Sequence, residues 1–91
     1  MPRPAPSYVV TLRNRASRQL RRVRNPDHNR ITEGIRGLSH DPLLGDVKKI
    51  RGRLYRLRVG SWRILYVISD DARVVTVTEV RRRNERTYRE L

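Results

Sequence analysis

The chain has 91 residues, and its 22 lysines and arginines against 9 aspartates and glutamates give a formal charge of +13. This length is typical of one domain, so we expect residues 1–91 to form a single domain, with residues 1–7 as a frayed lead-in. Cysteine is absent, which excludes disulfides, thiolate zinc sites and thiol nucleophiles.

The composition favours a folded protein outside the membrane. Leucine, isoleucine and valine exceed the roughly 20% of residues below which high charge indicates disorder. No apolar stretch approaches the ~18 residues of a membrane span, and no signal-peptide core follows the first residues, so we expect a cytoplasmic protein without membrane contact. His28 and His40 lack further ligand types nearby, so we expect no metal, and no motif calls for a cofactor.

The first half of the chain predicts a strand and a two-helix hairpin. Residues 8–12 are rich in β-formers and predict a short strand. A basic helix with a narrow apolar stripe follows, because apolar residues recur at helical spacing at Leu12, Ala16, Leu20 and Val23.

A second helix is predicted after the first, with Asn25 as N-cap and Pro26 at its first position. Its apolar face repeats at Ile31, Ile35 and Leu38, and it ends near His40. Gly34 and Gly37 each lower helix stability by about 0.8–1 kcal/mol relative to alanine. These glycines indicate either close packing or a marginal helix.

The second half changes to the period of two that is typical of strands. Residues 53–59, 62–69 and 73–80 predict three strands joined by short turns, hence an antiparallel meander. The tail 81–91 is expected to be a strand end followed by a polar turn or short helix. The predicted fold class is therefore α+β: an N-terminal strand, a two-helix hairpin and a three-strand meander in one sheet, with both helices on one face.

Strand alternation groups several arginines. It places Arg56 and Arg58 on one face of their strand, and Arg63 shares a face with Leu65 on the next strand. If these faces coincide, three guanidinium groups converge without a balancing acid, which favours a phosphate-bearing ligand. The alternative is that each of them is a solvated surface residue.

Further cations lie on neighbouring segments and favour binding of nucleic acid. The affinity of such binding is expected to fall strongly as the salt concentration rises. The residues expected to take part are Lys48, Lys49, Arg51, Arg53, Arg81, Arg82 and Arg86.

Four segments carry a family resemblance, and they lie at residues 47–52 (VKKIRG), 54–60 (LYRLRVG), 62–66 (WRILY) and 79–83 (EVRRR), followed by Tyr88. In this order and spacing the chain resembles the RelE/ParE superfamily of bacterial type II toxins. RelE-like members are ribosome-dependent mRNA endonucleases, whereas ParE-like members poison DNA gyrase and lack the nuclease residues. We take the RelE-like activity as the leading hypothesis and the gyrase poison as the alternative.

The resemblance also implies a site and a reaction. It assigns catalytic roles to Arg56, Arg58, Arg63, Arg83 and Tyr88, with Arg63 binding phosphate and Arg83 acting as acid or as a stabiliser of transition-state charge. The implied reaction is metal-independent attack of an mRNA 2′-hydroxyl on the adjacent phosphate. Where a toxin of this kind could use a lysine as general base, this chain has arginine. Arginine, with a pKa of about 12.5–13.8, is a poor base.

The resemblance further implies partners. These are a small acidic antitoxin, which would form a toxin–antitoxin hetero-oligomer, and the ribosome with its mRNA, or DNA gyrase under the alternative hypothesis.

Overall fold

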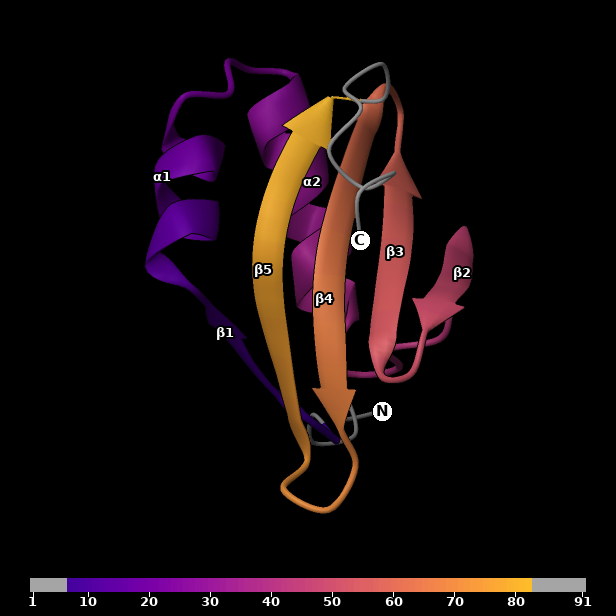
Figure 1. The fold of residues 1–91 in the computed structure, drawn as a ribbon. Coiled ribbons are helices and arrows are strands. Elements are labelled where there is room, and N and C mark those ends of the chain that lie inside the picture. Colours follow the sequence, from indigo (N-terminus) through magenta and orange to yellow (C-terminus); the bar gives the residue numbers. More distant parts are fainter. Residues whose placement is uncertain (1–6, 83–91) are drawn as a thin grey trace, which may run out of the picture.

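The computed structural model describes residues 7–82, in which two helices pack on a five-stranded sheet (Figure 1). The elements in chain order are β1 (Val9–Leu12), α1 (Asn14–Arg21), α2 (Asp27–Gly37), β2 (Val47–Arg51), β3 (Leu54–Val59), β4 (Trp62–Ser69) and β5 (Val74–Arg82). The predicted α+β class and the order of its elements are confirmed.

The sheet has the order β1-β5-β4-β3-β2. The pairs from β2 to β5 are antiparallel, as the predicted meander requires, and β1 joins the same sheet parallel to β5. Strand β2 was not among the predicted strands. Its residues are mostly exposed and charged, and a register shift between Lys49 and Arg51 separates its apolar residues Val47 and Ile50 by three positions, so the sequence lacks the apolar alternation of a half-buried strand.

The core lies between the helices and the sheet. Its largest fully buried side chains are Tyr66, Ile31, Leu38, Ile64, Val75 and Val77. The Tyr66 hydroxyl donates a hydrogen bond to the carbonyl of Pro42. Because burial raises the pKa of Tyr66 far above its usual value, this hydroxyl remains a donor at all physiological pH values.

The start of α2 differs from the prediction by one residue. Pro26 is the N-cap and the helix begins at Asp27. The side chain of Asn25 accepts a hydrogen bond from the backbone N–H of Asn29 at 3.2 Å, so it still serves the first turn of the helix.

The two glycines of α2 have different surroundings. A Cβ at Gly34 would lie 3.0 Å from Val59 Cγ2 and 3.2 Å from Leu57 Cδ2, whereas a Cβ at Gly37 would meet nothing within 4 Å. Close packing against β3 therefore explains Gly34 and does not explain Gly37.

Helix α1 continues the edge of the sheet where β1 stops. β1 pairs with β5 only from Val74 to Val77. Beyond that point the side-chain oxygen of Gln19 accepts a hydrogen bond of 2.7 Å from the backbone N–H of Val80. The helix thus lies beside the upper half of β5, as Figure 1 shows, and satisfies a backbone group that a strand would otherwise bind.

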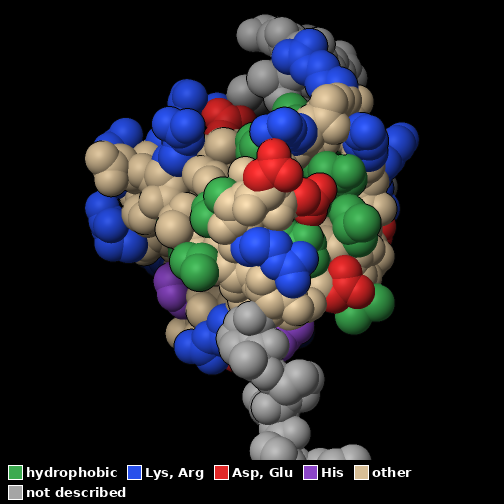
Figure 2. Space-filling model, turned by 90° about the horizontal axis from the view of Figure 1, so that it is seen from below, with side chains coloured by type: hydrophobic (Ala, Val, Ile, Leu, Met, Phe, Trp, Pro, Cys, Tyr) green, Lys and Arg blue, Asp and Glu red, His purple; other side chains and the backbone are tan. Residues whose placement is uncertain are grey.

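The lower end of the molecule has a mixed surface. Figure 2 shows acidic, basic and apolar side chains interspersed there. Among residues 7–82, no helix is both long and apolar enough to cross a membrane.

Candidate functional site

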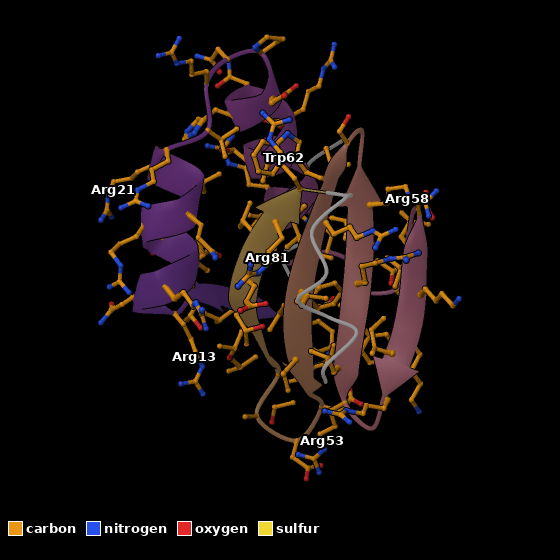
Figure 3. All side chains as sticks on the ribbon, turned by 45° about the horizontal axis from the view of Figure 1, so that its top comes forward. Arg13, Arg21, Arg53, Arg58, Trp62 and Arg81 are labelled. Atoms are coloured by element: carbon orange, nitrogen blue, oxygen red, sulfur yellow. The ribbon has the colours of Figure 1, made fainter. Side chains whose placement is uncertain are left out.

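Three arginines form a row across the sheet. In the strand pairing, Arg58 of β3 lies opposite Arg63 of β4, and Arg63 lies opposite Arg81 of β5. Residues directly opposite one another share a face of the sheet, and neighbouring strands are about 4.8 Å apart, so the row spans about 10 Å. We call Arg58, Arg63 and Arg81 the arginine row; Figure 3 labels its two outer members.

Arg56 lies next to this row on the same face, two residues before Arg58, and its side chain is buried, with 7% of its surface exposed. Its cross-strand neighbours are Lys48 and Leu65. The opposite face of β3 and β4 carries Leu57, Ile64 and Tyr66 of the core. The predicted grouping of Arg56, Arg58 and Arg63 on the helix-free face is therefore confirmed.

Arg81 joins the row because β5 contains a bulge. Tyr66 pairs with Val77, but Leu65 pairs with Glu79, so β5 has one extra residue at this point. Strict alternation from Val77 would turn Glu79 and Arg81 into the core. The bulge reverses their direction and turns Val80 inward instead, where it is 3% exposed.

Two carboxylates lie at the ends of the row. Asp46 Oδ2 is 3.8 Å from Arg58 Nε, and Glu79 Oε2 is 3.2 Å from Arg81 Nε. Glu79 also lies 3.3 Å from a guanidinium nitrogen of Arg15. The expectation of an arginine cluster without balancing acid is therefore wrong. Like charges directly opposite one another destabilise a sheet, and these acids offset part of that repulsion.

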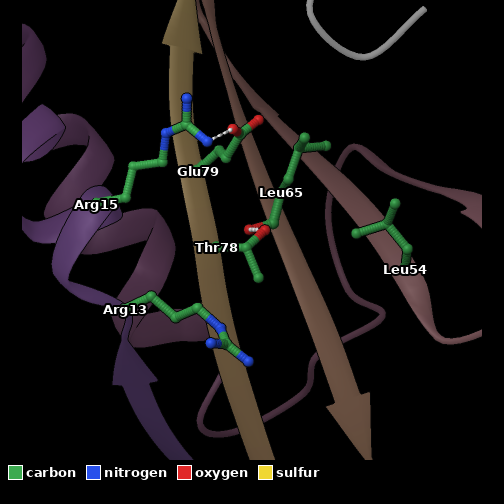
Figure 4. Close-up of a pocket in the computed structure, with 6 residues that line it drawn as sticks. All are labelled: Arg13, Arg15, Leu54, Leu65, Thr78 and Glu79. Atoms are coloured by element: carbon green, nitrogen blue, oxygen red, sulfur yellow. Dashed lines mark hydrogen bonds and ion pairs between the residues drawn. The ribbon is translucent and has the colours of Figure 1, made fainter. Parts of the chain in front are cut away.

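A cavity of about 290 Å³ lies at the pair of Leu65 and Glu79, two residues along the strands from the pair of Arg63 and Arg81 in the row. Figure 4 shows the residues that line it. Its lining residues are Arg13, Arg15, Leu54, Leu65, Thr78 and Glu79. The two arginines come from the junction of β1 and α1, where Arg13 has the extended backbone of an N-cap residue. Arg13, Arg15 and Glu79 were not predicted as site residues, because no local sequence pattern connects the start of α1 with the middle of β5.

The remaining predicted residues do not form one patch. Lys48 lies opposite Arg56 and shares its face, but Lys49 lies opposite Tyr55 on the other face. Arg53 precedes the first residue of β3, about 17 Å along the strand from Arg58 at about 3.4 Å per residue.

Others of the predicted residues lie outside the arginine face or outside the described part of the chain. Arg51 is exposed at the end of the edge strand β2. Arg82 turns away from the row, and its guanidinium carbon lies 4.8 Å from the ring centroid of Trp62. Arg83, Arg86 and Tyr88 fall outside residues 7–82, so their predicted roles are not placed by the structure.

Comparison with known proteins supports the resemblance. Residues 10–87 match the family described as the ParE toxin of the type II toxin–antitoxin system parDE. No curated protein sequence matches the chain.

Solved structures are similar to this fold over most of its length. The archaeal RelE–RelB complex from Pyrococcus horikoshii matches with a TM-score of 0.79 and 23% identity, over 87% of this chain and 98% of that one. The toxin–antitoxin complex RelBE2 from Mycobacterium tuberculosis matches with a TM-score of 0.75 and 28% identity, over 87% and 100%. The isolated RelE toxin from E. coli matches with a TM-score of 0.74 and 18% identity, over 91% and 93%.

Proposed function

The chain belongs to the ParE toxin family of type II toxin–antitoxin systems. We propose that, with a fold that it shares with RelE toxins, it acts by cleaving mRNA on the ribosome. The observation that carries the proposal is the arginine row with Arg56 beside it. Guanidinium groups remain charged and donate paired hydrogen bonds to phosphate oxygens. A row of three arginines, about 10 Å wide, is wide enough to contact one phosphate of an mRNA chain and the phosphates next to it.

In the proposed reaction, the 2′-oxygen of one nucleotide forms a bond to the adjacent phosphorus while the bond from phosphorus to the 5′-oxygen breaks. The products are a 2′,3′-cyclic phosphate and a 5′-hydroxyl, and the proton lost from the 2′-oxygen is matched by the one gained by the 5′-oxygen. Negative charge builds on the phosphate oxygens in the transition state. The arginines stabilise that charge because the strands fix them in place before the reaction.

The cavity next to the row suits the base of a bound nucleotide. Leu54 and Leu65 supply apolar walls, and Arg13 and Arg15 supply donors. A base in this cavity would hold its own phosphate near the arginines. Arg83 and Tyr88 complete the proposed machinery, with Arg83 at the leaving oxygen and Tyr88 stacking on a base.

We propose a small acidic antitoxin as the partner in the resting state. The charge of +13 opposes the compact fold by self-repulsion, and an acidic chain on the basic surface relieves it. Two of the similar structures are themselves complexes of a toxin with its antitoxin. A neighbouring reading frame for a small acidic protein is the expected genetic sign, and a gene without such a neighbour counts against this partner.

A second candidate is a DNA gyrase poison without nuclease activity. The specific observation that favours it is the matching family, which is that of the ParE toxin. The two candidates agree on the fold and on an antitoxin, and they differ in target.

The deciding experiment gives the purified toxin both targets in parallel. With mRNA-programmed ribosomes, we expect cuts confined to ribosome-bound message, with 5′-hydroxyl and 2′,3′-cyclic phosphate ends that primer extension and end-labelling identify. With gyrase and plasmid DNA, we expect no trapped cleavage complex. Intact mRNA together with trapped gyrase–DNA complexes would overturn the proposal in favour of the second candidate.

A further inference from the structure

A second cavity, of about 270 Å³, lies at the upper end of the sheet, between the α1–α2 connection and the ends of β4 and β5. Trp62, Arg82, Arg22 and Arg24 line it, together with Asp27 at the start of α2. None of the chemistry proposed above uses this cavity.

Trp62 is held rigidly in the wall of this cavity. It lies opposite Arg82 in the strand pairing, and the Arg82 guanidinium carbon is 4.8 Å from its ring centroid. Its indole N–H donates a hydrogen bond of 3.0 Å to Asp27 Oδ2. The ring is therefore fixed both at its face and at its nitrogen, and it forms a preorganised aromatic surface.

The charge in the cavity is strongly positive. Three arginines line it against one carboxylate, and that carboxylate already accepts the Trp62 hydrogen bond. Arg22 and Arg24 are exposed on the connection between the helices. Arginines in a concave site favour a phosphate group, and an aromatic ring among them favours a base attached to that phosphate.

The cavity and the arginine row lie on opposite faces of the same strand ends. Trp62 and Arg82 turn toward the helices, and their sequence neighbours Arg63 and Arg81 form part of the row. Figure 3 shows Trp62 beside the start of α2 and Arg81 on the outer face of β5. A nucleic-acid strand on the row that passes over the upper end of the sheet would reach the cavity.

We propose that this cavity is a second nucleic-acid site, in which Arg22, Arg24 and Arg82 hold a backbone phosphate and Trp62 contacts a base. The site requires only binding and does not depend on cleavage at the arginine row. RNA and DNA share the phosphate and the base, so both are tested.

Trp62 is the only tryptophan of the chain, so its fluorescence reports on the site directly. The purified toxin is titrated with a short single-stranded 2′-O-methyl RNA, which 2′-hydroxyl attack cannot cut, and with DNA of the same sequence. We expect saturable quenching of Trp62 by one or both. Quenching by both assigns a site for backbone and base, and quenching by RNA alone assigns an added contact to the ribose oxygen.

The matched variants separate this site from general charge. Arg22→Ala/Arg24→Ala is expected to reduce the slope of log affinity against log salt concentration by about 0.7, the value for one lost phosphate contact. Over the tenfold range from 1 M to 0.1 M salt, this slope change corresponds to a loss of affinity of about fivefold. Arg18→Ala/Arg21→Ala removes the same charge from α1 outside the cavity lining and is expected to change affinity by about twofold or less. Circular dichroism of both variants serves as the check that they are folded.

Three results would overturn the proposal. They are equal losses in the two double variants, binding without any change in Trp62 emission, and the same emission change with an oligoglutamate of equal length. Loss of ribosomal cleavage has no bearing on this readout, because the probe is uncleavable.

Discussion

The arginines of α1 and those of the arginine row are chemically identical, but their surroundings differ. Arg18 and Arg21 project from an eight-residue helix and are exposed to solvent. Arg58, Arg63 and Arg81 stand in register on three paired strands, with carboxylates at both ends of the row. Charge attracts a phosphate from a distance in both regions, but only the strands hold the guanidinium groups in fixed positions. The arginine row, the proposed catalytic region, therefore differs from the exposed arginines of α1 in the fixed position of its side chains and not in their charge.

The largest expected difference concerns cleavage. Arg63→Ala removes the centre of the row and is expected to lower the rate on programmed ribosomes about 100- to 1,000-fold, the range for loss of one preorganised donor. Arg18→Ala removes the same charge from α1 and is expected to change the rate by about twofold or less.

Arg63→Lys tests geometry at constant charge. We expect it to restore only a small part of the rate, because an ammonium group lacks the planar fork. Equal rates for Arg63→Ala and Arg18→Ala, with both proteins folded by circular dichroism, would remove the distinction between the two regions.

A smaller difference is expected in stability. Glu79 contacts Arg15 and Arg81, and its side chain is only 12% exposed. We expect Glu79→Gln to lower the free energy of unfolding by about 1–2 kcal/mol, since these charge-assisted contacts are weakened. In the control Glu33→Gln, the broken pair with Arg36 is more than 70% exposed on both sides, and the expected loss is about 0.5 kcal/mol or less. Urea unfolding at low salt measures the free energy of unfolding of both variants. Similar losses in the two would mean that an ion pair on the sheet contributes no more to stability than an exposed pair on a helix.

The smallest effects are expected at the glycines of α2. Gly34→Ala gains helix propensity but presses on Val59 and Leu57, and we expect a net loss of about 1 kcal/mol. Gly37→Ala gains propensity without any contact, so we expect stabilisation by up to about 1 kcal/mol. Thermal unfolding distinguishes the two signs. Stabilisation by both substitutions would show that the side chains of β3 shift to make room for a methyl group at position 34.

The pairing of Arg58 with Arg63 could be predicted from sequence for a definite physical reason. The two-residue turn at residues 60–61 places Val59 opposite Trp62, and the period of two then fixes every pair behind it. Local rules were sufficient because the whole unit is one hairpin.

Other parts of the site could not be predicted by such rules. The bulge that turns Glu79 and Arg81 outward breaks the alternation, and the burial of Val80 that accompanies it depends on packing against distant parts of the chain. Arg13 and Arg15 reach the cavity through tertiary packing of α1 against β5, which leaves no local sequence signal. Strand β2 was not predicted because its register shift separates Val47 and Ile50 by three positions and its other residues are charged, so no apolar period of two is left.

The hydrogen bond from Val80 to Gln19 has a consequence for solubility. An open strand edge recruits strands from other chains and so promotes aggregation. Along the upper half of β5, α1 occupies the place where such a strand would pair. At the opposite edge, β2 presents Lys48, Lys49 and Arg51, which repel a second copy of the chain. The sheet therefore resists growth by self-association at both places, and the basic side chains of β2 favour an acidic strand over a basic one at that edge.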